Sequence, residues 1–131
     1  MCVQDRLKIM TKIDQFEDLE CWQAARQLTK HVFQLSNTET LKSDFDTKKQ
    51  FKSAALSTMN NIAEGFARYN KKDFIRFLDY AQSSASEVKS MTYILEDLNL
   101  LEKFEINKLR EECDKVKSLT LGLLRYLEKK K

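Results

Sequence analysis

The scarcity of turn-forming residues constrains the fold of this chain more than any other feature of its sequence. Its 131 residues include two glycines and no proline. Reverse turns and hairpins depend on these two residue types, so a β-sandwich or β-barrel of this length would need many more of them. A collagenous or proline-rich disordered chain is excluded for the same reason. The composition therefore favours a single domain built from helices.

Apolar residues recur with the helical period of about 3.6 residues in four parts of the chain. We expect helices over residues 17–35, 46–67, 71–99 and 103–127. Asp44 and Asn70 are suitable caps for the second and third helices, and the short breaks around the third require antiparallel neighbours. The sequence thus predicts an all-α, antiparallel up-down-up-down four-helix bundle over residues 16–131, preceded by an N-terminal arm over residues 1–15.

The charges are unevenly distributed although the formal net charge is only +3. Residues 37–72 carry 7 basic and 4 acidic side chains, and residues 102–131 carry 9 basic and 6 acidic ones. The intervening residues 73–101 have the opposite balance, with 2 basic and 5 acidic side chains. This asymmetry permits a basic face, although mixed charges are also typical of a solvated helix surface.

Several features indicate a cytoplasmic protein without a membrane span. No apolar run approaches the roughly 20 residues that cross a bilayer, and the first residues lack the apolar core of a secretory signal. The three cysteines, Cys2, Cys21 and Cys113, lie far apart and form no C-x-x-C pair. We expect them to be reduced thiols, with Cys113 buried on the apolar face of its helix.

The sequence has no residue set typical of a catalytic, cofactor or metal site. Its single histidine, His31, follows Leu28 by three residues, so the Glu-x-x-His pairs of a di-metal helical bundle are missing. No Cys/His pairing, Ser/His/Asp set or glycine-rich phosphate loop is present. We therefore expect no catalytic residue, no metal, no cofactor and no enzymatic activity. His31 itself is expected at the surface or boundary of its helix without a functional role.

The most distinctive run spans residues 60–68 (NNIAEGFAR) and 71–78 (KKDFIRFL), where the second helix ends and the third begins. Gly65 continues the apolar pattern, where glycine costs about 1 kcal/mol relative to alanine. Close packing against a neighbouring helix is the favoured reason for this glycine. Glu64 and Arg76 lie six residues on either side of Asn70, so an antiparallel hairpin predicts an ion pair between them.

These residues resemble a four-helix-bundle family encoded by intervening sequences in bacterial large-subunit ribosomal RNA genes, whose members were first labelled ribosomal proteins. Three segments carry the resemblance in order. They are residues 16–26 (FEDLECWQAAR), residues 61–66 with Asn61, Glu64 and Gly65, and residues 72–78 with Arg76. The resemblance covers most of the chain and implies the bundle fold.

The related accessory variability determinant proteins of retroelements look similar in fold. That resemblance implies a pentameric ring that assists a reverse transcriptase by binding RNA and protein. Two positions depart from the family pattern. Met59 stands where members often have proline, and Lys52 is followed by Ser53 where members have a basic pair. The second departure weakens a nucleic-acid role carried over to this helix.

One functional hypothesis is a non-enzymatic module that binds nucleic acid, with RNA as the favoured ligand. Phosphate contacts need only suitably placed basic side chains. The candidates are Lys48, Lys49 and Lys52 on the second helix, Arg68, Lys71 and Lys72 at the hairpin, and the tail 129–131. Tyr69, between these basic residues, is a candidate for stacking on a base. For any single lysine, a solvated surface position is the simpler interpretation.

The alternative hypothesis is a homo-oligomeric protein-interaction scaffold, or an accessory to a partner enzyme such as a reverse transcriptase. Ile75 and Tyr93 lie about 100° from the start of the apolar stripe of the third helix, so we expect them to serve as oligomer contacts. A pentamer is preferred because the family resemblance implies it. The two hypotheses are compatible if a ring repeats the basic residues several times.

Overall fold

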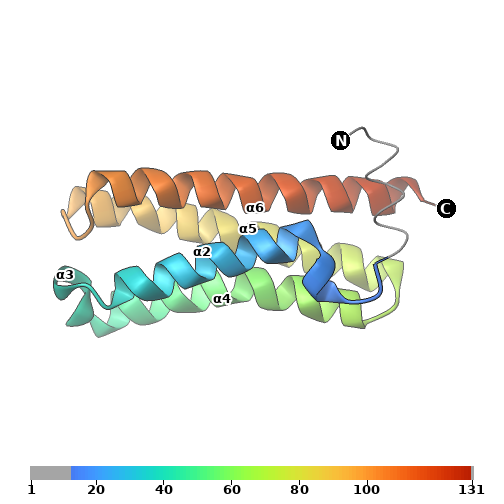
Figure 1. Cartoon of the computed structure of the whole chain (residues 1–131), viewed down its shortest axis with the longest axis horizontal. Helices are drawn as coiled ribbons and strands as arrows, with labels where there is room; N and C mark the ends of the chain where they lie inside the picture. The colour runs from blue at the N-terminus through green and yellow to red at the C-terminus, as the bar shows by residue number, and fades with distance from the viewer. Residues whose placement is uncertain (1–12, 131) are drawn as a thin grey trace.

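The computed structural model of the protein describes residues 13–130. It consists of helices, and no strand occurs among these residues. In chain order the elements are the 3₁₀ turn η1 (Phe16–Asp18) and the α-helices α2 (Glu20–Ser36), α3 (Glu39–Lys42), α4 (Phe45–Ala67), α5 (Lys71–Asp97) and α6 (Lys103–Lys129). The four long helices run antiparallel to their neighbours, which confirms the predicted up-down bundle (Figure 1).

Each long helix packs against two others. α4 lies between α2 and α5, and α6 lies between α5 and α2, so the ring of four contacts closes. The apolar stripes of these helices meet along the bundle axis. The largest fully buried side chains are those of Phe51, Leu28, Leu41, Ile62, Leu78, Leu95, Ile106 and Leu109. Cys113 is fully buried among them, as predicted.

Helix ends follow the capping residues that the sequence indicates. The Asp44 carboxylate accepts a hydrogen bond from the Thr47 N–H at 3.2 Å, and the Asn70 side chain accepts one from the Asp73 N–H at 3.1 Å. Both predicted caps are therefore confirmed. Asn99 and Tyr69 adopt left-handed backbone angles, with φ of 54° and 55°, in the turns that follow α5 and α4. Left-handed geometry is common for asparagine but strained for tyrosine.

The short helix α3 is an element that the sequence analysis did not anticipate. It occupies part of the connection between α2 and α4, and its Leu41 is fully buried at that end of the core. Four residues are too few to display a helical period, so the pattern could not reveal it.

Gly65 lies inside α4 and is buried against α5. A Cβ at this position would lie 2.7 Å from the Cβ of Phe77 and 3.1 Å from Cδ1 of Phe74. Real Cβ atoms essentially never approach that closely, so the glycine allows the two helices to touch. The close packing predicted for Gly65 is confirmed.

The predicted ion pair between Glu64 and Arg76 is wrong. Glu64 instead pairs with Arg68, four residues along α4, at 3.5 Å. Arg76 pairs with Asp73, three residues earlier in α5, at 3.3 Å. On one helix, residues three or four apart are held near each other by the backbone itself. Glu64 and Arg76 therefore each pair with a residue of their own helix, and not with each other across the hairpin.

The predicted N-terminal arm and Cys2 lie outside the described residues, apart from positions 13–15. Ile13 is partly buried against the core. Over residues 13–130, none of the helices combines the length and apolar character that crossing a membrane requires.

Candidate nucleic-acid interface

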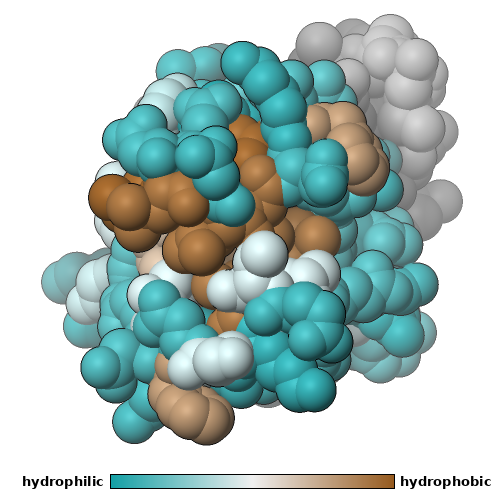
Figure 2. All heavy atoms as spheres, turned by 90° about the vertical axis from the view of Figure 1, so that its left-hand side faces the viewer, coloured by the Kyte–Doolittle hydropathy of each residue, from teal (hydrophilic) through white to brown (hydrophobic). Residues whose placement is uncertain are grey.

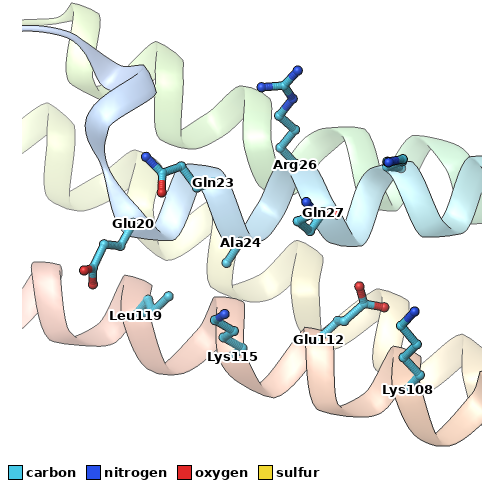
Figure 3. A pocket seen from close by; sticks show the side chains of 10 residues that line it. Glu20, Gln23, Ala24, Arg26, Gln27, Lys108, Glu112, Lys115 and Leu119 are labelled. Atoms are coloured by element: carbon cyan, nitrogen blue, oxygen red, sulfur yellow. The ribbon is translucent and has the colours of Figure 1, made fainter.

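An open groove of about 930 Å³ lies between α2 and α6 (Figure 3). We call it the α2–α6 groove. Its residues are the basic Arg26, Lys30, Lys108 and Lys115, the acidic Glu20 and Glu112, the amides Gln23 and Gln27, and the apolar Ala24 and Leu119. Basic side chains outnumber acidic ones by four to two. Ala24 is a small buried residue, which leaves room between the two helices.

The basic residues of the groove come from the exposed faces of two helices that are distant in sequence. Arg26 and Lys30 are four residues apart on α2, and Lys108 and Lys115 are seven apart on α6, so each pair shares one face of its helix. At 1.5 Å per residue, the α6 pair spans about 10 Å along the helix axis. Arg26 points away from α6 in Figure 3, and its guanidinium lies 5.7 Å from the centre of the Trp22 ring. Lys30 on one wall and Lys108 and Lys115 on the other supply the remaining positive charges of the groove.

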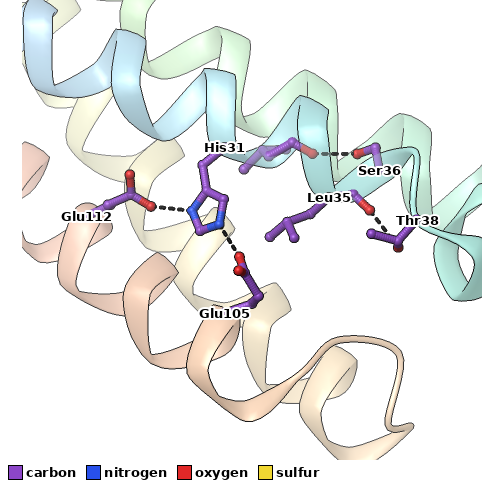
Figure 4. A network of polar contacts seen from close by, with 7 residues as sticks. His31, Leu35, Ser36, Thr38, Glu105 and Glu112 are labelled. Carbon is purple, nitrogen blue, oxygen red and sulfur yellow. Dashed lines mark hydrogen bonds and ion pairs between the residues drawn. The ribbon is translucent and has the colours of Figure 1, made fainter.

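His31 connects the two walls. Its Nδ1 lies 2.5 Å from Oε1 of Glu112, and its Nε2 contacts Oε2 of Glu105 (Figure 4). Glu105 and Glu112 are two helical turns apart on α6, so the imidazole of α2 lies between them. The residue is 7% exposed, which corrects the expectation that it lies at the surface or boundary of its helix.

The hydrogen bonds to Glu112 and Glu105 raise the pKa of His31 above its ordinary value, although burial acts in the opposite direction. The positions of the two carboxylates also favour the protonated ring. An imidazolium donates from both ring nitrogens, which is what two carboxylates require, whereas a neutral ring would turn a lone pair toward one of them. The protonated ring is therefore the form that this pair of carboxylates stabilises.

The lysines predicted at the start of α4 have local partners. Lys48 Nζ donates to the Lys42 carbonyl at 3.1 Å and lies 4.9 Å from the centre of the Phe45 ring. Lys52 Nζ lies 4.5 Å from the centre of the Phe33 ring. Lys49 is exposed. These contacts hold two of the three charges close to the protein surface.

The basic residues predicted at the α4–α5 hairpin are at the other end of α4. Arg68 pairs with Glu64 and lies 5.1 Å from the Phe77 ring centre. Lys71 Nζ donates to the Lys130 carbonyl, and Lys72 is exposed. Lys52 and Arg68 are sixteen residues apart, which corresponds to roughly 24 Å along the helix. The structure therefore does not bring the two predicted groups together, whereas it does bring together basic residues of α2 and α6 that were not singled out.

A signal for the groove was present in the sequence but incomplete. The basic excess of residues 102–131 includes Lys108 and Lys115, and the i, i+4 spacing of Arg26 and Lys30 marks a charged face of α2. Neither observation says that these two faces adjoin.

The other predicted residues lie on α4, on α5 and in the turn between them. Asn61 Nδ2 donates to the carbonyl and the hydroxyl of Ser57, both at 2.8 Å. Ile75 is partly buried and packs against the core of the monomer, and its role as an oligomer contact stays a prediction. Tyr93 is 51% exposed, and the Arg110 guanidinium lies 3.9 Å from the centre of its ring. Tyr69 is 91% exposed.

Exposed apolar side chains gather at the end of the bundle that holds α3 and the α5–α6 turn. Figure 2 shows brown surface on this end, surrounded by hydrophilic residues. Large exposed residues of this region are Phe45, Ile94, Leu98 and Phe104. Exposed apolar side chains gathered at one end of a molecule are typical of an interaction surface.

Residues 13–130 include two cysteines, and neither is accessible. Cys21 and Cys113 are free and buried, and burial raises the pKa of each thiol to about 12. Such thiols are poor nucleophiles because the thiolate is the reactive form. Within the same residues no three side chains of the types His, Cys, Asp and Glu are grouped to hold a metal ion.

Comparison with known proteins places the chain among helical bundles. The model of the family described as 23S rRNA-intervening sequence protein matches residues 17–122. A crystal structure of a protein of unknown function from the S23 ribosomal protein family, from Bacteroides thetaiotaomicron, superposes with a TM-score of 0.73. The two sequences are 16% identical over 80% of this chain and 95% of that one. No curated protein sequence matches the chain.

Proposed function

We propose that this chain, which belongs to the 23S rRNA-intervening sequence protein family, is a non-enzymatic RNA-binding module that acts as a homo-oligomer. The observation that carries the proposal is the α2–α6 groove, where two helices present four basic side chains against two acidic ones. The family membership adds the fold and does not itself supply the ligand. The groove supplies the chemistry.

The groove suits the sugar-phosphate backbone better than the bases. Its lining contains lysine, arginine and glutamine side chains, which donate to phosphate oxygens, and it contains no aromatic residue on which a base would stack. Binding by such a surface tolerates changes of sequence and weakens steeply with salt, because contacts with phosphates release counterions. Structured RNA at low salt is therefore the appropriate probe.

Charge reversal in two matched sets of residues tests this proposal. The groove variant carries Lys30→Glu, Lys108→Glu and Lys115→Glu. The control variant carries Lys48→Glu, Lys49→Glu and Lys52→Glu, which changes the net charge equally at the site predicted from the sequence. We expect the groove variant to lose retention of an RNA hairpin at roughly 50 mM salt, while the control retains most of it. Circular dichroism verifies that both variants keep their helices.

Each result has a distinct meaning. Equal loss in both variants would show that net charge, and not the groove, drives binding. If only the control variant lost RNA retention, the RNA would contact α4 and not the groove. Absence of RNA retention by the wild type under these conditions would overturn the proposal.

The homo-oligomer is the second part of the proposal, with a pentamer preferred on the resemblance described above. A cyclic assembly would repeat the groove around a ring, so that several weak phosphate sites act on one RNA. Light scattering after size exclusion measures this directly. A mass close to 15.4 kDa, that of one chain, at micromolar concentration would overturn it.

A protein-interaction scaffold is the second candidate, and the exposed apolar end of the bundle favours it. Leu98 and Phe104 are 59% and 65% exposed. If this end joins copies of the chain, Leu98→Ser with Phe104→Ser should lower the mass in light scattering without loss of helix. Failure of wild-type RNA binding together with a mass change in this variant would favour the scaffold.

A further inference from the structure

Glu112 lines the α2–α6 groove and also contacts His31. Its side chain lines the α2–α6 groove beside Lys108 and Lys115. Its Oε1 also lies 2.5 Å from Nδ1 of His31 (Figure 4). Glu105, the other partner of the imidazole, does not line the groove. The state of one buried ring therefore determines how an acidic wall residue of the basic groove is held.

We propose that His31 is a positioning residue for RNA binding in the groove: while its ring carries both protons, it holds the Glu112 carboxylate and offsets its negative charge. This inference rests on the proposed function. With the ring protonated, Lys30, Lys108 and Lys115 face an RNA backbone without an uncompensated carboxylate between them. Loss of one proton removes a positive charge and leaves one carboxylate against the lone pair of a ring nitrogen.

The surroundings of His31 define which charges act on it. On α6, Glu105 and Glu112 contact the two ring nitrogens. Lys108 of α6 and Lys30 of α2 line the groove together with Glu112. On α4, the other neighbour of α2, Lys52 lies over the ring of Phe33, two residues after His31 and so on the opposite face of α2. The two carboxylates are thus the groups that contact the ring directly.

The direction of the pH effect follows from these contacts. The glutamates favour the charged ring, so its charge persists above the ordinary histidine value of about 6.5 and is lost at higher pH. RNA phosphates keep their charge throughout this range. Affinity should therefore be highest while His31 is protonated and should decline as pH rises. By linkage, bound RNA favours the protonated ring, so binding in this range takes up protons.

Four proteins test the inference with one assay. The affinity of a fluorescent RNA hairpin is measured by anisotropy at roughly 50 mM salt, between about pH 6 and pH 9. Wild-type affinity should fall by about twofold to fivefold over this range, the effect of one screened charge. His31→Gln, which cannot titrate, should bind at the weaker level with a flat profile.

The two glutamates provide a matched pair. Glu112→Gln and Glu105→Gln each remove one negative charge beside the His31 imidazole, but only Glu112→Gln changes the lining of the groove. Glu112→Gln should bind more tightly than wild type at high pH and depend little on pH. Glu105→Gln should keep the pH dependence, with the fall displaced to lower pH because one of the two stabilising hydrogen bonds is lost.

Three results would overturn the inference. The first is a wild-type slope in His31→Gln. The second is equal behaviour of the two glutamate variants, and the third is weaker binding by Glu112→Gln than by wild type. If His31→Gln does not fold, the glutamate pair decides the matter alone. Absence of wild-type binding at every pH would overturn the proposed function as well, which distinguishes the two failures.

Discussion

The α4–α5 and α2–α6 helix pairs are both antiparallel neighbours in one bundle, yet they meet in opposite ways. Between α4 and α5, Gly65 leaves no room even for a Cβ against Phe77, and the hydroxyls of Ser57 and Ser84 lie 2.8 Å apart. Between α2 and α6, a charged groove stays open, and the His31 cluster bridges its two sides. The first interface is closed by small residues, whereas the outer side of the second is lined by charged residues above the shared apolar core.

This difference separates stability from binding. Close backbone contact adds dispersion contacts and excludes water, so it stabilises the fold but leaves no surface for a ligand. An interface of long charged side chains gains little stability from each exposed pair, but it keeps donors accessible. The tight α4–α5 contact therefore contributes to stability, and the proposed RNA partner is assigned to the accessible α2–α6 groove.

The largest expected effect is on the closed interface. Gly65→Leu should destabilise the protein by about 3 kcal/mol, because the side chain would collide with Cβ of Phe77 and force the helices apart. Urea unfolding followed by circular dichroism measures this. Gly122→Leu is the matched control, since an added Cβ there meets nothing within 4 Å. Equal stability of the two variants would contradict the contrast between the interfaces.

A smaller effect is expected at the charged interface, and it depends on pH. The pKa of His31 is raised in the folded protein, so the folded state binds the proton more tightly than the unfolded state. The stabilisation is complete below the unfolded value of about 6.5 and is lost as pH rises through the higher folded value. Wild-type Tm should therefore fall over this window relative to His31→Gln. If the Tm of both proteins changed with pH in the same way, protonation of His31 would not stabilise the α2–α6 interface.

Gly122 offers an effect of opposite sign. It lies exposed within α6, with nothing within 4 Å of an added Cβ, so neither packing nor a left-handed backbone requires glycine there. Gly122→Ala should stabilise the protein by about 0.5–1 kcal/mol through helix propensity. Thermal unfolding of the variant checks this. A loss of stability would reveal a close contact with another copy of the chain at this site.

The smallest expected effect sharpens the account of the closed interface. Ser84→Ala removes the hydroxyl that donates to Ser57 across α4–α5 and should cost about 0.5 kcal/mol. The Ser57 hydroxyl keeps a second partner in Asn61, which limits the loss. Urea unfolding resolves a change of this size, and a cost above that of Gly65→Leu would reverse the assignment of what closes the interface.

The parts of this protein that the sequence determined are those governed by residues near one another in the chain. The near absence of glycine and proline and the 3.6-residue period predicted four long helices, and Asp44 and Asn70 were correctly predicted as caps. The close packing of Gly65 and the burial of Cys113 also followed from their places in an apolar stripe. Periodicity reports which face of a helix is buried, and these features need no more than that.

Tertiary structure decided which exposed faces adjoin. A stripe does not specify which charged face of α2 lies beside which face of α6, because helices far apart in sequence become neighbours only when the bundle closes. For that reason the sequence could not pair His31 with Glu105 and Glu112, nor unite Lys30 with Lys108 and Lys115. The sequence predicted an ion pair between Glu64 and Arg76, whereas each has a partner on its own helix. Charged side chains are long and their pairing is weakly directional, so the assembled backbone selects their partners.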